Sequence, residues 1–285
     1  MRKAISHLSA ALFLGAQIFL AQHVSANAAA TEFAHSWDSG ERIPKGDVTA
    51  LARLRFLTAL DFPPFNYLDS ENHLTGFNVD LARALCDVLE IADRCQIQAL
   101  PWEELQPGLK NGQGEAVIAG IAASEPARQS MIFSRAYMRM AARFAVNKKT
   151  PLQDPQGGGF GASVIGVVSG SSHEAMLRAY FPKAKIETFA SADLLYKATR
   201  EGKAAAVFGD AMALSFWLQG SASAGCCAFS GEAYFSDAFL GSGMRIALKP
   251  EDAALMQSLN FALKTVQEKG VMEELYLKYF PMGFY

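Results

Sequence analysis

Two side chains of opposite charge, Arg128 and Asp210, are the strongest candidates for ligand chemistry in this sequence. Arg128 follows the apolar segment Ala116–Ile121, and Asp210 follows the apolar segment Ala204–Phe208. Both segments have the composition of buried strands, and small ligands bind beyond the carboxyl ends of strands in α/β sheets. An arginine fork suits a carboxylate, and an aspartate suits an ammonium group. The pair therefore predicts a binding site for a zwitterion, such as a free α-amino acid.

The elements that must position these side chains alternate between strands and helices. Apolar runs predict strands near Arg55–Leu60, Ala116–Ile121, Ser163–Val168, Ala204–Phe208 and Arg245–Leu248, and the change of composition after Phe144–Val146 suggests a crossing between lobes. Start signals or apolar spacing predict helices near Val79, after Ser124 with Pro126 in the first turn, after Ser171 with Glu174 at the capping-box spacing, after Ser191, and from Pro250. Alternation of this kind is typical of an α/β fold.

The N-terminus has the composition of an export signal. Residues 1–26 combine the cations Arg2 and Lys3, an apolar stretch from about Leu8 to Ala21 and small residues at the end. Residues 27–50 are polar, lack periodicity and are expected to form an extended leader. The apolar stretch is short for a membrane span. We therefore expect a mature chain that is exported after cleavage.

Composition and motifs argue against several classes of function. The formal net charge is −2, and the Lys and Arg residues are scattered, which gives little support for nucleic-acid binding. No two of the five histidines have metal-ligand spacing. The glycine-rich run Gly157–Gly161 precedes a predicted strand instead of following one, so it predicts a loop and no dinucleotide site. No serine lies in a nucleophile-elbow pattern.

Four cysteines remain in this exported chain. Cys86 and Cys95 flank the end of a predicted helix, close enough for a disulfide that closes a local loop. Cys226 and Cys227 are adjacent, which permits a vicinal bridge, two buried thiols or one reactive thiol.

A series of segments resembles one known family. Together they span about Leu54 to Pro281, and they occur in the order of the family 3 periplasmic solute-binding proteins, which serve ABC transporters of polar amino acids. The matching segments are Asp61–Tyr67, Leu74–Ala82, Trp102–Leu109, Ala116–Arg128, Phe133–Tyr137, Gly166–Ser172, Ala204–Asp210 and Glu268–Pro281.

The resemblance implies a fold of two α/β lobes joined by two crossover strands, with the ligand bound in the cleft. Lobe 1 would comprise residues 51–145 and 237–285, and lobe 2 would comprise residues 146–236. It implies a monomeric receptor without a cofactor.

The resemblance also assigns binding roles. Arg128 would grip the ligand carboxylate, and Asp210 would accept from its ammonium group. The aromatic rings of Phe62 and Trp102 would pack on the ligand. Backbone groups of Gly120 and Ala122 would approach it. Ser171 and Ser172 would supply donors from the start of a helix. The sequence departs from the family pattern where Ala122 and Ala123 replace hydroxyl side chains, and the turn before Arg128 is one residue longer.

Each of these residues also has a purely structural interpretation. Arg128 could be a solvated arginine on a helix that also carries Arg135. Asp210 could serve as the cap of the following helix and have no binding role. Phe62 and Trp102 could pack within a lobe, and Ser171 and Ser172 must cap a helix in any case. His173 fits a solvated first-turn residue better than a ligand group. Context favours the binding roles, because Arg128 is the only cation that the sequence predicts at a strand end facing the site.

The resemblance implies a periplasmic receptor that delivers a free amino acid to an ABC permease and catalyses no reaction. Its cargo would be neutral or polar and not lysine, arginine or ornithine, because Ala59 stands where members for basic amino acids carry an acidic residue. Asp61 could compensate if it turned inward. Two alternatives are an exported lyase similar to cyclohexadienyl dehydratase, with Asp61 as general acid or base, and an accessory or sensory binding protein without a transport role.

Overall fold

The computed structural model describes residues 40–152, 159–280 and 282–285, all of which lie in one unit, Thr31–Tyr285. The expected signal at residues 1–26, most of the expected leader and part of the glycine-rich run lie outside the described residues. No helix of the described part is long and apolar enough to cross a membrane.

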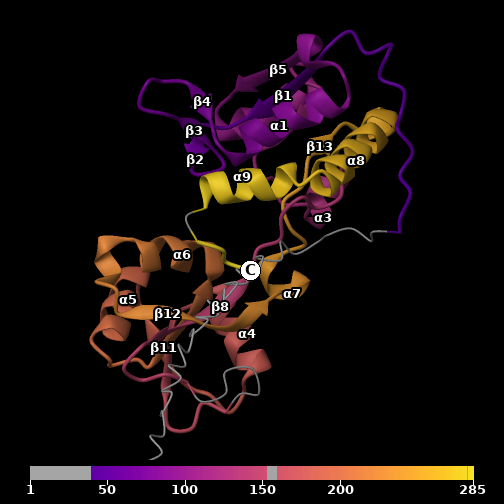
Figure 1. Ribbon diagram of the computed structural model, residues 1–285. Helices are drawn as coiled ribbons and strands as arrows, with labels where there is room; N and C mark the ends of the chain where they lie inside the picture. Colours follow the sequence, from indigo (N-terminus) through magenta and orange to yellow (C-terminus); the bar gives the residue numbers. More distant parts are fainter. Residues whose placement is uncertain (1–39, 153–158, 281) are drawn as a thin grey trace, which may run out of the picture. The chain divides into compact units, whose positions relative to one another are not determined.

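The first sheet has five strands in the order β5-β1-β6-β13-β7. Strands β5, β1 and β13 are labelled in Figure 1. Its strands are β1 (Leu54–Thr58), β5 (Cys95–Ala99), β6 (Ala116–Val117), β7 (Ile132–Phe133) and β13 (Ala247–Leu248). Strand β1 is parallel to β5 and β6, whereas β13 is antiparallel to β6 and β7. Leu54, Phe56 and Leu57 are all fully buried, so β1 is covered on both faces, as a strand of a largely parallel sheet must be.

Helices and short elements cover this sheet. They are α1 (Phe77–Val88), α2 (Leu105–Lys110), α3 (Glu125–Arg128), α8 (Ala253–Glu268), α9 (Val271–Tyr279) and the 3₁₀ turns η1 (Ala92–Arg94), η2 (Trp102–Glu104) and η4 (Pro250–Asp252). A small sheet contains β2 (Asp61–Phe62), β3 (Asn66–Leu68) and β4 (Leu74–Thr75). Helices α1, α8 and α9 pack on one another. The Asp80 carboxylate joins α1 to α9 by accepting hydrogen bonds from Lys278 and Tyr279.

The second sheet has the order β10-β9-β11-β8-β12. Its strands are β8 (Ala142–Asn147), β9 (Val164–Val168), β10 (Lys185–Phe189), β11 (Ala206–Asp210) and β12 (Cys227–Tyr234). Strands β9, β10 and β11 are parallel, and β8 is antiparallel to β11 and β12. Its helices are α4 (Ser172–Tyr180), α5 (Ala192–Arg200), α6 (Ala211–Gln219) and α7 (Asp237–Leu240), with η3 at Ser221–Ser223. Phe144, Phe181 and Phe208 form an aromatic core with their ring centroids 4.7–6.3 Å apart.

Two chain segments connect the sheets. The chain leaves the first sheet after β7 and returns to it between β12 and β13. The two segments meet at an antiparallel bridge between Met138 and Met244, where the Met244 N–H donates to the Met138 carbonyl at 2.7 Å. This arrangement of two α/β lobes with two crossovers confirms the predicted fold class.

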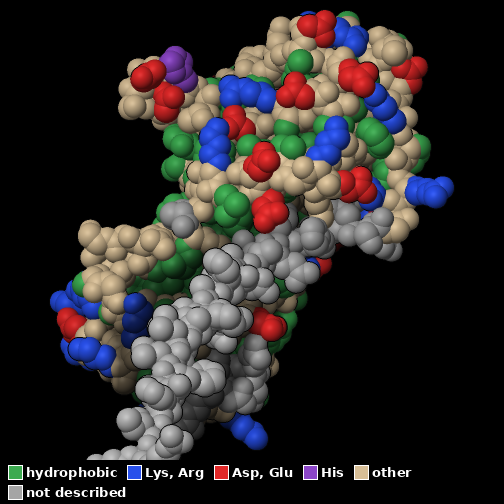
Figure 2. Space-filling model, viewed as in Figure 1, with side chains coloured by type: hydrophobic (Ala, Val, Ile, Leu, Met, Phe, Trp, Pro, Cys, Tyr) green, Lys and Arg blue, Asp and Glu red, His purple; other side chains and the backbone are tan. Residues whose placement is uncertain are grey.

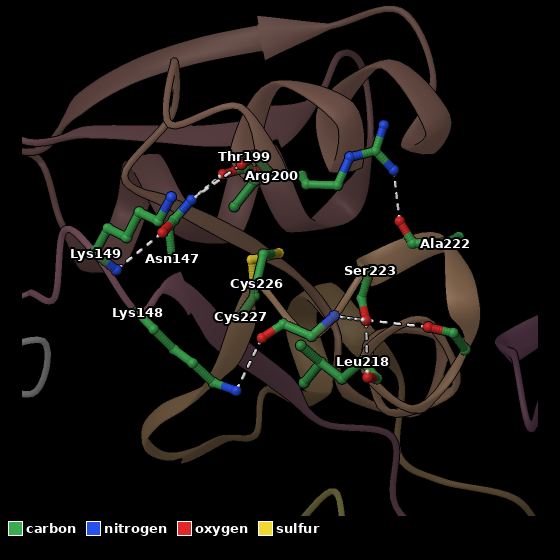
Figure 3. Close-up of a disulfide and its surroundings, with 12 residues drawn as sticks. Asn147, Lys148, Lys149, Thr199, Arg200, Leu218, Ala222, Ser223, Cys226 and Cys227 are labelled. Atoms are coloured by element: carbon green, nitrogen blue, oxygen red, sulfur yellow. Dashed lines mark hydrogen bonds between the residues drawn. A yellow bond between two sulfur atoms is a disulfide. The ribbon is translucent and has the colours of Figure 1, made fainter.

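All four cysteines are disulfide-bonded. The predicted Cys86–Cys95 bridge links the end of α1 to the first residue of β5. A bridge that closes a loop of this length typically stabilises a fold by about 2–4 kcal/mol. The Cys226–Cys227 pair, which the sequence left open, forms a vicinal disulfide at the start of β12 (Figure 3). Lys148 holds the same turn, since its backbone N–H donates to the Cys226 carbonyl and its ammonium group to the Gly225 carbonyl.

Candidate functional site

Phe62 and Gly120, two of the predicted binding residues, lie in contact at the edge of the first sheet. Gly120 has a φ of +81°, a conformation that favours glycine, and a Cβ atom there would lie 3.0 Å from Cε1 of Phe62. Glycine therefore allows the Phe62 ring to approach the backbone beyond β6. The Phe62 ring stacks on Phe65 at 4.7 Å between centroids and stays half-buried, which leaves part of it available to a ligand.

Arg128 is the last residue of α3, a short helix positioned by the turn after β6. Ser124 caps this helix by accepting a hydrogen bond from the Ala127 N–H, and Pro126 lies in the first turn, both as predicted. The Arg128 side chain is exposed. Its Nε donates to the Ala123 carbonyl at 3.0 Å, and its Cζ lies 5.6 Å from the Phe133 ring centroid. Within the described residues the guanidinium has no carboxylate partner, so its two terminal amino groups are available to an anion.

Ala122 and Trp102 are exposed and have no established contact with Phe62, Gly120 or Arg128 among the described residues. Ala122 is exposed between β6 and α3. Trp102 begins η2 beyond the end of β5 and is 51% exposed. Both residues lie past the carboxyl ends of strands of the first sheet, as their predicted roles require. Their part in binding stays a prediction.

Ser171, Ser172 and Asp210 lie at one edge of the second sheet. They follow β9 and β11, which are neighbouring parallel strands and therefore end on the same side. Ser171 caps α4 by accepting from the Glu174 N–H at 3.1 Å, and Glu174 accepts from the Gly170 N–H at 2.7 Å, which confirms the predicted capping pair. Ser172 is the exposed first residue of α4.

Asp210 ends β11 and caps α6. Its Oδ1 accepts from the Ala213 N–H at 2.7 Å. Burial raises the pKa of the Asp210 carboxyl, although the Ala213 hydrogen bond and the nearby His173 oppose the shift. The structural and the binding interpretations are therefore compatible, since the carboxylate that caps α6 through Oδ1 also has a second oxygen that can accept hydrogen bonds.

His173 is a neighbour of Asp210 that the sequence placed in solvent. The ring is half-buried, and Nε2 is buried without a hydrogen-bond partner among the described residues. Burial lowers the pKa of His173, while the Asp210 carboxylate opposes that shift. The interpretation as a solvated residue is wrong, because β9 and β11 end side by side and bring the first turn of α4 against Asp210. The burial of His173 could have been predicted from the parallel pairing of β9 and β11, had that pairing been known.

Arg245 is a second cation at the carboxyl end of the first sheet, so the expectation that Arg128 stands alone there is also wrong. It lies two residues before β13 and donates to the Ser134 carbonyl at 2.8 Å.

Arg135, predicted on the same helix as Arg128, is not helical, since α3 ends at Arg128. It forms an ion pair with Glu41.

These groups can bind charged and polar ligand atoms. Arg128 offers N–H donors to an anion, and Asp210 offers an acceptor to a cation. Within the described residues no group of three or more His, Cys, Asp or Glu side chains could hold a metal ion. On the face shown in Figure 2, the basic and acidic side chains are intermixed and do not gather by sign.

Known proteins are similar to this chain in sequence or in fold. The model of the bacterial extracellular solute-binding proteins, family 3, matches residues 54–282. A protein of Escherichia coli strain K12 named as an ABC transporter arginine-binding protein is 30% identical over 234 residues, covering 81% of this chain and 92% of its own.

Two solved structures illustrate the shared fold. The second substrate-binding domain of an amino acid ABC transporter from Streptococcus pneumoniae has a TM-score of 0.68 at 19% identity, covering 80% of this chain and all of its own. An ancestral cyclohexadienyl dehydratase also has a TM-score of 0.68, at 20% identity, covering 85% of this chain and 99% of its own.

Proposed function

This chain belongs to family 3 of the bacterial extracellular solute-binding proteins, and from that premise we propose that it binds a free amino acid in the periplasm and delivers it to an ABC permease. The protein performs no chemistry on its cargo and acts as a monomer without a cofactor. Cleavage of residues 1–26 releases the mature receptor. The similarity to a protein named as an ABC transporter arginine-binding protein supports the transport role.

One observation carries the proposal of an amino acid ligand. Arg128 and Asp210 lie beyond the carboxyl ends of strands in different sheets, and the Arg128 guanidinium has no carboxylate partner among the described residues. A free α-amino acid supplies both missing charges, a carboxylate for Arg128 and an ammonium group for Asp210. Charge-assisted hydrogen bonds of this kind contribute about 1.5–3 kcal/mol each.

Binding and delivery are coupled through the two lobes. In our proposal lobe 1, which contains the first sheet, supplies Arg128, and lobe 2, which contains the second sheet, supplies Ser171, Ser172 and Asp210. A ligand that contacts both sets favours the closed arrangement by its differential affinity, and hinge closure is the established motion of periplasmic binding proteins. The permease would then distinguish the closed, loaded receptor from the open one.

The cargo is a neutral or polar amino acid and not a cationic one. Ala59, which stands where basic-amino-acid members carry an acidic residue, is buried among apolar side chains. Asp61, the acidic residue that could compensate, is exposed on β2. A buried ammonium or guanidinium of the ligand would lack a partner here and would be costly.

A competition series tests this preference. We expect the ligand-free protein to bind at least one of glutamine, serine, leucine or glutamate more tightly than arginine, lysine and ornithine, by at least tenfold. Isothermal titration with each amino acid measures the affinities, and displacement of the tightest ligand by the others provides the internal control. Tighter binding of arginine or lysine than of every non-cationic amino acid would contradict the preference and leave the receptor function intact.

A further inference from the structure

Arg245 is held at the start of β13 by neutral groups only. Its Nη1 donates to the Ser134 carbonyl at 2.8 Å and its Nη2 to the Ser242 carbonyl at 3.2 Å. Its Nε is buried and has no hydrogen-bond partner in the described part of the chain. Backbone carbonyls accept hydrogen bonds but do not neutralise a charge, so this half-buried guanidinium keeps its positive charge. Two of its five N–H donors are used, which leaves the buried Nε–H and one further N–H on each terminal nitrogen.

Arg245 and Arg128 both contact the segment Phe133–Ser134. Arg128 lies over the Phe133 ring, and Arg245 binds the carbonyl of the next residue, Ser134. The pairing of β13 with β7 sets Ala247 opposite Phe133 and continues through hydrogen bonds between Ile246 and Ser134. Because side chains alternate along a strand, Arg245 is directed to the same face of the sheet as Phe133.

Neither Arg128 nor Arg245 forms an ion pair with a carboxylate among the described residues. Asp237, whose charge acts on Arg245, is itself paired with Arg139 at 2.9 Å. Burial lowers the pKa of Arg245, and the positive charge of Arg128 lowers it further, while Asp237 opposes both effects. The first sheet therefore presents two guanidinium charges beyond the carboxyl end of β6, and no carboxylate of the described residues pairs with either of them.

We propose that Arg128 and Arg245 bind two separate carboxylates of one ligand, so that the cargo, within the polar class proposed above, is an acidic amino acid such as glutamate or aspartate. This inference rests on the proposed receptor function and deepens it. The terminal amino groups of Arg128 suffice for a bidentate grip on the α-carboxylate. The side-chain carboxylate then accepts from the remaining terminal N–H groups of Arg245, and the ammonium group donates to Asp210. Charges balance only for this class of ligand, since a neutral amino acid leaves one guanidinium unpaired.

Titration of the ligand-free, full mature protein with glutamate and glutamine tests the inference, because the two ligands differ in one charge and hardly in shape. We expect wild type to bind glutamate at least tenfold more tightly than glutamine. Arg245→Gln should reduce glutamate affinity at least tenfold and change glutamine affinity less than threefold. Arg245→Lys, which keeps the charge, should retain part of the preference. Lys249→Gln, at the other end of β13, is the matched control and should change neither affinity.

Each other result has a distinct meaning. Equal or tighter binding of glutamine by wild type overturns the inference while the receptor function stands. Equal losses for both ligands in Arg245→Gln show that Arg245 only supports the carbonyls of Ser134 and Ser242, which also overturns it. If Arg245→Gln does not fold, the inference is tested by the wild-type preference for glutamate over glutamine and by whether Arg245→Lys keeps part of that preference. Loss of the preference from either protein overturns the inference. If wild type binds no amino acid at all, the proposed function itself fails.

Discussion

Replacing Arg128 with alanine is expected to lower the affinity for every amino acid ligand at least about 100-fold and to leave the fold intact. The loss follows from removing two charge-assisted hydrogen bonds to the ligand carboxylate, at about 1.5–3 kcal/mol each. The fold should survive because the Arg128 side chain is exposed, and the interactions it makes with described residues are one hydrogen bond to the Ala123 carbonyl and one contact with the Phe133 ring. Isothermal titration gives the affinity, and circular dichroism with thermal unfolding checks the fold.

Two variants serve as controls for this result. Arg128→Lys keeps the charge without the planar fork and should fall between wild type and alanine. Arg135→Ala removes a cation seven residues further along the chain, whose ion-pair partner is Glu41, and should leave affinity unchanged. An Arg128→Ala protein that binds within threefold of wild type would show that Arg128 does not anchor the ligand.

Replacing Asp210 with asparagine is expected to weaken binding of α-amino acids by about 10- to 100-fold. The substitution removes the charge opposite the ligand ammonium, a bond worth about 1.5–3 kcal/mol. It should spare α6, because an asparagine oxygen can accept from the Ala213 N–H as the Asp210 carboxylate does. Titration of wild type and variant with an amino acid measures the change.

The desamino analogue of the same amino acid, which lacks the ammonium group, is the matched control. Wild type and Asp210→Asn should bind this analogue with affinities within threefold of each other. Equal losses for the amino acid and its analogue would show that Asp210 acts through the structure of α6 and not through the ligand.

Local signals explain what the sequence could predict. Ser124, Ser171 and Ser191 each cap the helix that the sequence assigned to them, because a cap depends on residues three positions apart. The alternation of strands and helices predicted the α/β class, because each element is also recognised from its own local apolar pattern. The expected strand Ala116–Ile121 is confirmed only as β6 (Ala116–Val117), since Gly120 turns the chain out of the extended conformation at a φ of +81°.

Long-range contacts account for what the sequence missed. Arg245 was assigned only to a strand, because its position is set by Ser134, 111 residues earlier. His173 was placed in solvent, because its burial depends on Asp210 at the end of a neighbouring strand. Adjacent cysteines carry no signal of their redox state, so the Cys226–Cys227 bridge also required the structure. The site residues that the sequence named stay predictions until ligand binding is measured.

The central claim, that this chain is a receptor for a free amino acid, is tested most directly by thermal unfolding of the refolded, ligand-free mature protein in the presence of each amino acid. A ligand at 100-fold over its dissociation constant stabilises the native state by about 2.7 kcal/mol, which corresponds to a rise in Tm of about 5–10 °C for a chain of this size. The account predicts such a rise for at least one amino acid, with glutamate or aspartate among the largest. An unchanged Tm with all of the amino acids at millimolar concentration would contradict it.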